Sequence, residues 1–319
     1  MHGDQLPDSN AIDSLHIENA MKKIALITSA SSLAIDFDMP LLIPAFRSIG
    51  LDVDVCDWEN HAIDWSIYDA AVLRSPWNYV DSLPKFLNWC DGVEKQTTLL
   101  NPAVVARWNL DKYYLADIQA RGVPIVPTQF VEPGQEPDRA MQSFLDMHPQ
   151  ANEVVIKPTV GAYSKDVQRY ARTRLTDAAK YIESLLGLGH HVILQPYLDS
   201  IDSHGETDLT FFNGAYSHAI RKNAMLMADG TVNVPTQDLR SSREADQDEQ
   251  RIASRALATA AECLKLTRPL VYGRVDLIRG TDGQPVVLEL EICEPSLNLP
   301  FTEHGADRFA MAISDRLAC

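Results

Sequence analysis

The segment Val271–Cys293, VYGRVDLIRGTDGQPVVLELEIC, predicts a β-hairpin near the C-terminus. Two apolar runs flank the dipeptide Asp282-Gly283, which is a strong signal for a two-residue hairpin loop. With that loop, Thr281 faces Gln284, and this sets the register of the two strands. Because side chains alternate between the faces of a strand, one face is expected to be apolar and to join a core. The apolar face holds Val275, Leu277, Leu288, Leu290 and Ile292.

The opposite face of this hairpin gathers charge. In the expected register Asp276 lies opposite Glu289, and Arg274 lies opposite Glu291. Facing residues have Cβ atoms about 4.5–5.5 Å apart, and like charges at that spacing repel each other. Hard divalent cations prefer carboxylate oxygens, so this face predicts a metal site. The alternative is a solvated acidic face on which Arg274 pairs with Glu291.

A second hairpin is predicted around Asn213-Gly214. In the register that this loop sets, Glu206 lies opposite Arg221. The strand that carries Arg221 ends in cations, which either form a surface ion pair of at most about 1 kcal/mol or face an anion. The cationic group would consist of His218, Arg221 and Lys222. Expected on one face of that strand are Tyr216, His218, Ile220 and Lys222.

The first third of the chain alternates short apolar runs with helical patterns, as a parallel sheet with crossover helices does. Strands are expected at 22–28, 51–56 and 69–73, with a helix at 40–49. Ligands of such sheets bind beyond the carboxyl ends of the strands. The loop after the third strand is therefore a candidate substrate loop, in which Arg74 needs an anionic partner. The candidate substrate residues are Arg74, Ser75, Trp77 and Asn78.

Further elements are predicted along the rest of the chain. Helices are expected at 109–119, 139–147, 175–186, 244–264 and 307–317, and strands at 125–131, 153–157 and 191–195. Lys157 ends one strand just before the loop Thr159–Lys165, where it could contact a phosphate or simply extend into solvent. The sequence contains no P-loop, dinucleotide-binding, serine-hydrolase or HExxH motif.

The composition excludes several classes of protein. The 319 residues include 28 Lys and Arg against 44 Asp and Glu, a formal net charge of −16. Such a protein is a poor partner for nucleic acid or an anionic membrane, so we expect it to handle small molecules. The five cysteines form no C-x-x-C pair, and residues 1–20 lack the pattern of a signal peptide. We therefore expect a cytoplasmic protein with a flexible extension at residues 1–20.

Taken in chain order, these features resemble the ATP-grasp superfamily of carboxylate–amine ligases, over almost the whole chain after Met21. The resemblance implies an α/β (α+β) fold with a Rossmann-like parallel-sheet substrate domain and two α+β subdomains that enclose the nucleotide. The implied boundaries are 21–105 for the substrate domain, 106–199 for a linker helix and the small subdomain, and 200–319 for the large subdomain. The implied nucleotide-binding residues are Lys112, Lys157, Gln195, Tyr197, Leu198 and Glu206.

The same resemblance implies ATP and Mg²⁺ as cofactors. Two Mg²⁺ ions, or Mn²⁺ in their place, would be bound by Asp276, Glu289 and Glu291. The implied catalytic residues are Arg274, Arg221 and Lys222, which would stabilise an acyl phosphate, and His218, a candidate base for the amine. The sequence departs from the family in two places: Gly161 is the one glycine of a loop that is often glycine-rich, and Glu291 stands where Asn is common.

Four shorter motifs look like the group that contains the D-cycloserine-forming cyclo-ligase. They are Leu73–Tyr79 (LRSPWNY), Tyr216–Ala219 (YSHA), Arg221-Lys222 and Cys293–Leu297 (CEPSL). The β-lactam-forming ATP-grasp enzyme of tabtoxin biosynthesis belongs to a similar class. The likeness implies an enzyme of antibiotic or toxin biosynthesis that closes a lactam or cycloserine-like ring in an amino-acid-derived substrate.

Three alternatives stay open on the sequence. One is intermolecular amide formation between two amino acids, one is a non-catalytic ATP-binding protein of the same fold, and one is a carboxylate-bridged metallohydrolase. The expected partner is a small amino-acid-like molecule rather than nucleic acid or membrane. Whether the chain forms a homodimer also stays open.

Overall fold

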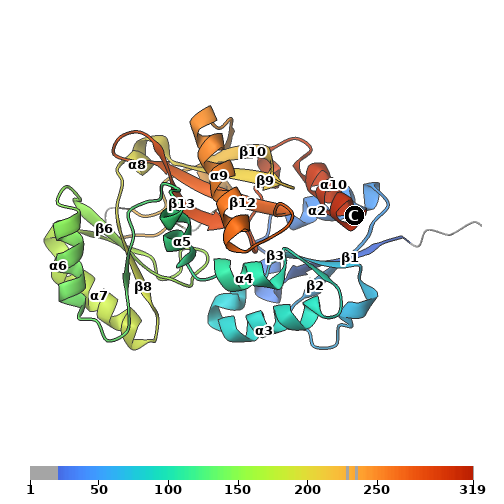
Figure 1. Cartoon of the computed structure of the whole chain (residues 1–319), viewed down its shortest axis with the longest axis horizontal. Coiled ribbons are helices and arrows are strands. Elements are labelled where there is room, and N and C mark those ends of the chain that lie inside the picture. The colour runs from blue at the N-terminus through green and yellow to red at the C-terminus, as the bar shows by residue number, and fades with distance from the viewer. Residues whose placement is uncertain (1–20, 228–229, 234–235, 319) are drawn as a thin grey trace, which may run out of the picture.

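The computed structural model describes residues 21–227, 230–233 and 236–318. The expectation for residues 1–20 lies outside these ranges. The described residues form three β-sheets, each with helices packed on it (Figure 1). We call them the N-terminal sheet, the small sheet and the large sheet.

The N-terminal sheet is parallel, with strand order β2-β1-β3-β4, which confirms the predicted crossover topology. Its strands are β1 (Lys23–Thr28), β2 (Asp52–Asp57), β3 (Ala70–Ser75) and β4 (Thr98–Leu100). Helix α2 (Met39–Ser48) packs on one face and α3 (Leu83–Glu94) on the other. Because β1 is buried on both faces, its sequence is a continuous apolar run rather than an alternation.

The small sheet is antiparallel, with strand order β5-β8-β6-β7. Its strands are β5 (Gln129–Val131), β6 (Glu153–Pro158), β7 (Gln168–Ala171) and β8 (Val192–Pro196). Helices α6 (Pro137–Met147) and α7 (Leu175–Gly187) bury one face against Val154 and Ile156. The opposite face carries Lys157.

The large sheet is antiparallel, with strand order β11-β10-β9-β12-β13. Its strands are β9 (Glu206–Phe212), β10 (Ala215–Lys222), β11 (Arg240–Arg243), β12 (Tyr272–Arg279) and β13 (Pro285–Glu291). Helices α5 (Tyr114–Ala120) and α9 (Gln247–Cys263) pack on its apolar face, where they meet Leu209, Val275 and Leu290. The charged residues of β12 and β13 are thereby directed to the other face.

The C-terminal helix α10 (Gly305–Ala318) returns to the N-terminal sheet and lies beside α2 (Figure 1). Phe309 packs edge-on against Phe46, with ring centroids 6.0 Å apart. The last segment of the chain therefore ties the large sheet to the N-terminal sheet. Within the described ranges, the structure has no helix with the length and apolar character needed to span a membrane.

Most of the predicted elements are confirmed, and the differences have local reasons. The helix expected at 109–119 begins later, as α5, because a turn separates it from α4 (Ala103–Asn109), a helix that was not predicted. In that turn the Lys112 N–H donates to Thr159 O at 2.9 Å. The strand expected at 125–131 is reduced to β5. Helix α3 was not predicted, because Pro84 and Gly92 interrupt its apolar pattern. The remaining short helices are α1 (Ala30–Leu33) and α8 (Ser200–His204).

Candidate active site

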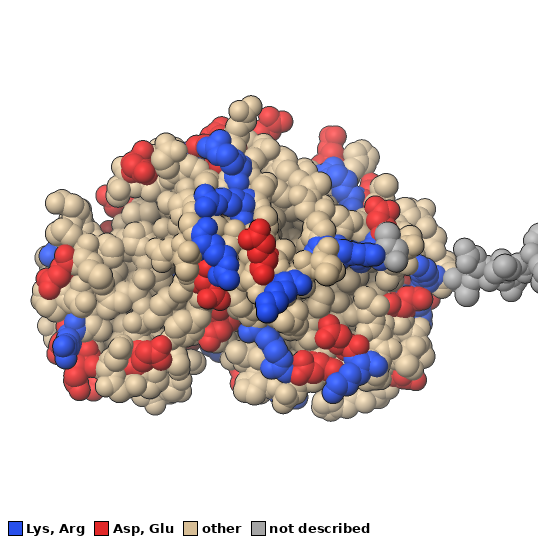
Figure 2. Space-filling model, viewed as in Figure 1, with Lys and Arg blue, Asp and Glu red and all other residues tan. Residues whose placement is uncertain are grey.

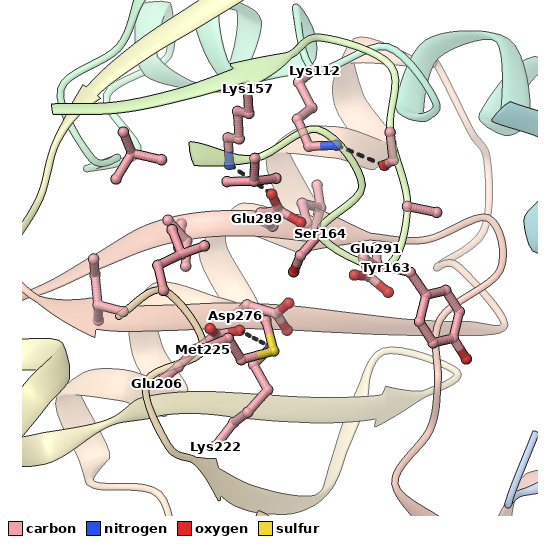
Figure 3. A pocket seen from close by; sticks show the side chains of 18 of the residues that line it. Lys112, Lys157, Tyr163, Ser164, Glu206, Lys222, Met225, Asp276, Glu289 and Glu291 are labelled. Atoms are coloured by element: carbon pink, nitrogen blue, oxygen red, sulfur yellow. Dashed lines mark hydrogen bonds and ion pairs between the residues drawn. The ribbon is translucent and has the colours of Figure 1, made fainter. Parts of the chain in front are cut away.

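A cavity lies between the small sheet and the large sheet and extends to the N-terminal part of the chain. Figure 3 looks into it. Lys112 and Lys157 project from one wall, and Asp276, Glu289 and Glu291 lie on the hairpin that faces them. Lys157 comes from β6 of the small sheet and Lys112 from the turn before α5, whereas the large sheet supplies the carboxylates.

The acidic hairpin has the predicted pairing where it lines the cavity. Asp276 pairs with Glu289, and Arg274 pairs with Glu291. One ligand oxygen from each of Asp276, Glu289 and Glu291 lies within 4.8 Å of the others. Three carboxylates at this spacing form an oxygen donor set of the kind that Mg²⁺ and Mn²⁺ prefer.

The loop of this hairpin is longer than predicted. The Gly280 N–H donates to Gln284 O at 2.8 Å, so residues 281–283 form a three-residue loop. The prediction that Thr281 faces Gln284 is therefore wrong. A three-residue loop alone would shift the strands by one residue.

A β-bulge compensates for the longer loop. The register changes between Asp276 and Leu277, and Leu277 pairs with Val287, so that Leu288 is the extra residue of β13. The bulge restores the pairing of Asp276 with Glu289. It also corrects one core prediction, because Leu288 lines the cavity instead of packing with the helices.

Strand β9 adds an acid that the sequence analysis did not assign to the site. Asp208 lies opposite Asp276 in the pairing of β9 with β12, and both side chains are almost fully buried. Glu206, Asp208 and Asp276 form a second group with ligand oxygens within 4.8 Å of one another. The E-x-D spacing of β9 was visible in the sequence, but its pairing with β12 was not.

A second bulge corrects the register of the β9–β10 hairpin. The pairing shifts between Tyr216 and His218, so Glu206 lies opposite Lys222 and not opposite Arg221. The Lys222 ammonium forms an ion pair with Glu206 and lies 3.7 Å from Asp208. Burial alone would lower the pKa of Lys222, but Asp208 and Glu206 outweigh burial and raise it.

Arg221 projects away from the cavity as a result. Its guanidinium donates to Ser203 O at 2.6 Å, and it is not among the residues that line the cavity. The same bulge separates Tyr216, which packs on the side of α9, from His218, Ile220 and Lys222. The expectations that Arg221 stabilises an acyl phosphate and that Tyr216 shares the face of Lys222 therefore do not agree with the structure.

His218 is buried outside the cavity lining. Its Nε2 lies 2.8 Å from Leu297 O and its Nδ1 lies 2.9 Å from Ser217 Oγ, so both ring nitrogens have partners. Burial lowers the pKa of His218 to about 4. This placement contradicts a role as base for the amine and makes His218 a support for the segment around Leu297.

Arg274 is the cation within the acidic hairpin. Its Nε and Nη2 donate to the two oxygens of Asp276 at 2.7 and 2.8 Å, and Nη2 lies 2.5 Å from Glu291. Its Nη1 donates to Ser296 O at 2.8 Å. In this structure Glu291 thus pairs with Arg274 and also belongs to the three-carboxylate group.

The charges of this hairpin shift one another's pKa values. Burial raises the pKa of Glu291 to about 8, with further increases from Asp276 and Glu289 that Arg274 opposes. Burial also raises the pKa of Asp276. For Glu289, burial is outweighed by Lys157 and Lys112, which lower its pKa. The two lysines therefore hold Glu289 ionised, and a bound cation would favour the ionised form of Glu291 as well.

Lys112 and Lys157 are both almost fully buried in the opposite wall. The Lys157 Nζ contacts Glu289 Oε1 at 2.7 Å, which bridges the gap between the two sheets. The Lys112 Nζ donates to Gly161 O at 3.0 Å in the loop after β6. The contact of Lys157 with Glu289 brings together residues that are 132 positions apart in the sequence.

The segment Gln195–Leu198 lines the far end of the same cavity. The Gln195 amide donates to Thr128 Oγ1 at 2.9 Å, and the Tyr197 ring lies 3.4 Å from the Arg169 guanidinium. The Gln195 amide and the Tyr197 ring thus contact other protein groups, so the cavity surface near them is largely apolar. Apolar side chains that line the cavity include Val155, Leu198, Ile201, Ile278 and Leu288.

Most side chains of the candidate substrate loop bond to other protein groups instead of facing the cavity. Arg74 is fully buried, donates to Pro295 O at 2.6 Å and lies 4.0 Å from Asp38, which is its anionic partner. Ser75 bonds to Thr28, and Asn78 bonds to Trp58. Arg74, Ser75 and Asn78 do not line the cavity, contrary to the prediction, whereas Trp77 does.

The loop after β6 closes over the cavity by contacts with the N-terminal part of the chain. The Tyr163 ring packs edge-on against Trp77, with centroids 4.8 Å apart. Lys165 forms an ion pair of 2.9 Å with Asp81. The loop with only Gly161 is thus held by side chains. Lining residues that the sequence analysis did not assign to the site include Phe37, Tyr79, Tyr163, Arg240 and Glu294.

The fold and this site define an ATP-grasp ligase, and comparison with known proteins agrees. The ligase PsnB, solved with a precursor variant, Mg and ADP, has a TM-score of 0.63 at 14% identity, with 92% of this chain and 98% of that chain covered. D-alanine–D-alanine ligase from Bacillus anthracis has a TM-score of 0.63 at 13% identity, with 93% and 97% covered. At these identities the two structures show the fold alone.

The chain belongs to the family of the cycloserine biosynthesis protein DcsG. It is 54% identical to that protein from Streptomyces lavendulae over 294 residues, 92% of this chain and 98% of the relative. The crystal structure of D-cycloserine synthetase DcsG superimposes with a TM-score of 0.90, covering 92% of this chain and 99% of that one. Residues 24–101 match the family model for the N-terminal domain of D-cycloserine synthetase DcsG. The chain is therefore an ATP-dependent ligase that forms a C–N bond.

Proposed function

We propose that the cavity binds ATP between the small and large sheets, with its phosphates next to Lys112 and Lys157. The observation that carries this proposal is the 2.7 Å contact between Lys157 and Glu289 across the two sheets. It places a cation suited to phosphate beside an acid suited to a metal ion. The apolar surface near Leu198 would receive the adenine ring.

We further propose that Asp276, Glu289 and Glu291 hold two Mg²⁺ ions, with Mn²⁺ as an alternative. The donor set is entirely oxygen, and its compactness fits a divalent cation. Bound Mg²⁺ would neutralise charge on the β- and γ-phosphates. Arg274, which pairs with Glu291 here, would then turn part of its hydrogen-bonding capacity toward the substrate.

The reaction proceeds in two steps in this proposal. A substrate carboxylate oxygen bonds to the γ-phosphorus while the bond from that phosphorus to the ADP oxygen breaks, which gives an acyl phosphate and ADP. A nitrogen then bonds to the acyl carbon, the carbon–oxygen bond to phosphate breaks, and the nitrogen gives its proton to the departing phosphate. Arg274 and Lys222 stabilise negative charge, and the closed loop around Tyr163 excludes water.

The nitrogen belongs to the same molecule in our proposal, as the cycloserine product of the relative's name indicates. Cycloserine is a five-membered ring in which the acyl carbon is bonded to a nitrogen carried on the side-chain oxygen. The substrate would therefore be an amino acid with a nucleophilic nitrogen on that oxygen.

The metal assignment is tested by ADP release with 2-amino-3-(aminooxy)propanoate, the simplest compound that yields cycloserine by loss of water. We expect release that requires Mg²⁺ and is lost in Asp276→Asn and Glu289→Gln, while Glu303→Gln, an exposed change outside the cavity, keeps it. Full turnover in both site variants would contradict the assignment. Metal-dependent hydrolysis without ATP would favour a metallohydrolase instead.

Mass spectrometry distinguishes ring closure from its alternatives. A cyclised product has the mass of one substrate minus water, whereas an intermolecular product contains two amino acids. Tight ATP binding without phosphate release for this substrate or for amino-acid mixtures would favour a non-catalytic ATP-binding protein.

A further inference from the structure

Glu294 is an acid in the cavity that the chemistry above does not use. It follows β13, three residues after Glu291, and lines the cavity. Asp276, Glu289 and Glu291 each have a Lys or Arg nitrogen within 4 Å. For Glu294, the described part of the chain provides no Lys, Arg or His nitrogen within that distance of its carboxylate. Its charge is therefore available to a ligand.

The surroundings of Glu294 fix its position without neutralising it. The Trp77 indole N–H donates to the Glu294 backbone O at 2.9 Å. The Tyr79 hydroxyl and the Cys293 thiol lie beside the carboxylate. Burial raises the pKa of Glu294, against smaller opposing effects of these two groups and of Lys112, which forms no ion pair with it. A partly buried carboxylate without an ion-pair partner is costly to keep ionised. A cationic ligand that enters the cavity would remove this cost.

Glu294 lies at the end of the cavity that the Tyr163 loop covers. Trp77 joins the two, because its N–H holds Glu294 and its ring packs on Tyr163. Figure 3 shows Tyr163 beyond Glu291, on the side away from Glu206. This end is therefore separate from the apolar end at Leu198, where the proposed adenine site lies.

The chemistry of an amino-acid substrate requires a cation site at this end. Its carboxylate has to meet the γ-phosphate beside Glu291 and Arg274, and its α-ammonium group is attached to the next carbon. A carboxylate that lies close to Glu291 but is not engaged by metal is suited to recognise this ammonium. Glu294 has this position, since it lines the cavity three residues after Glu291 and outside the three-carboxylate group.

We propose that Glu294 binds the α-ammonium group of the substrate and that Trp77 and Tyr79 form the wall behind it. This inference rests on the proposed ring closure and deepens it. Glu294 then selects α-amino acids over carboxylic acids that carry the same nucleophilic nitrogen but no amino group. The substrate class is an amino-acid zwitterion with a nucleophile on its side chain.

The test compares cycloserine with isoxazolidin-3-one, the same ring without the amino group. Isothermal titration calorimetry in the presence of ADP and Mg²⁺ gives both dissociation constants. We expect the wild type to bind cycloserine at least about tenfold more tightly, as a desolvated charge pair implies. In Glu294→Gln this preference should fall toward one through weaker cycloserine binding, with the dissociation constant of isoxazolidin-3-one unchanged.

Two controls separate recognition from folding. Glu303→Gln should keep the preference, and the increase in melting temperature caused by ADP and Mg²⁺ should be the same in Glu294→Gln as in the wild type. A Glu294→Gln protein that keeps the wild-type preference would overturn the inference, as would a wild type without any preference, while leaving ring closure intact. A wild type that binds neither ring and forms no cyclised product would contradict the proposed function itself.

Discussion

Replacing Arg274 with methionine tests the charge network on which the site is built. Arg274 is 5% exposed, and its guanidinium donates to Asp276 at 2.7 and 2.8 Å, to Glu291 at 2.5 Å and to Ser296 O at 2.8 Å. Methionine keeps much of the apolar stem and removes the charge. Asp208, at 3.7 Å, loses the same cation.

The expected magnitude follows from these contacts. Breaking a buried ion pair by removal of one partner costs about 3–5 kcal/mol, because the other charge stays buried. Arg274 pairs directly with two carboxylates, which would raise the cost. In its absence these carboxylates can bind protons, which limits the loss of stability. We therefore expect the free energy of unfolding to fall by about 3–5 kcal/mol at pH 8 and by less at pH 6, where protonation is easier. A protein of ordinary stability, about 5–15 kcal/mol, would still fold.

The assay is urea denaturation at pH 6 and pH 8 without divalent cations, followed by tryptophan fluorescence. Arg268→Met, an exposed position, is the matched control and should change stability by less than about 0.5 kcal/mol. A loss below about 1 kcal/mol at pH 8 with an unchanged m-value would refute the reasoning. So would a loss that is larger at pH 6 than at pH 8.

Three further predictions concern the contact between domains at Asp38, ADP binding at Lys157 and closure of the Tyr163 loop at Trp77. Burial, with Asp36, raises the pKa of Asp38 to about 6 despite Arg74, so the contribution of Asp38 to wild-type stability should fall as the pH rises from about 4 to about 6. Asp38→Asn should remove this slope, and its stability relative to wild type should rise by about 3 kcal/mol over that range in urea titrations; a decrease would show that Arg74 dominates. Lys157→Met should weaken ADP binding at least about tenfold in calorimetry, and unchanged binding would place the phosphates elsewhere. Trp77→Phe should release more ADP than product, since a loosened Tyr163 loop lets water reach the acyl phosphate. A one-to-one ratio of ADP to product would argue against exclusion of water by this loop.

On the face shown in Figure 2, basic and acidic side chains are intermingled along the middle of the molecule rather than gathered into a basic patch. The net charge of −16 thus coexists with a local group of cations inside the cavity. A nucleotide that arrives with Mg²⁺ is compatible with both.

The register of the acidic hairpin was predicted correctly at the site but not in the loop. The sequence pairs Asp276 with Glu289 correctly, but the predicted loop is one residue too short and the β-bulge is not predicted. The two differences cancel at the site. In the β9–β10 hairpin the loop was predicted correctly, but the bulge was not, so Arg221 was placed opposite Glu206 where Lys222 stands. A bulge has weak local sequence signals, because the packing of the whole strand decides where it occurs.

The site residues divide in the same way. Lys112, Lys157 and the acids of β12 and β13 could be named from motifs that stand at the ends of predicted elements. Asp208 and Glu294 could not, because no local pattern states which strands pair or which loop faces the cavity. Arg74 was assigned to substrate because a strand-end arginine needs an anion, and only the structure showed that Asp38 meets this need.

The sequence by itself determined the order of the elements, the parallel N-terminal sheet and the charged face of the last hairpin. These features depend on periodicity and on short turn signals, which act over a few neighbouring residues, whereas the class of ligase was implied by resemblance to a known family. The tertiary structure decided which charges meet: Lys157 with Glu289, and Lys222 with Glu206. It also left Glu294 without an ion pair to any described residue. Such contacts join distant parts of the chain, and their energies depend on burial and distance, which exist only once the three sheets have packed together.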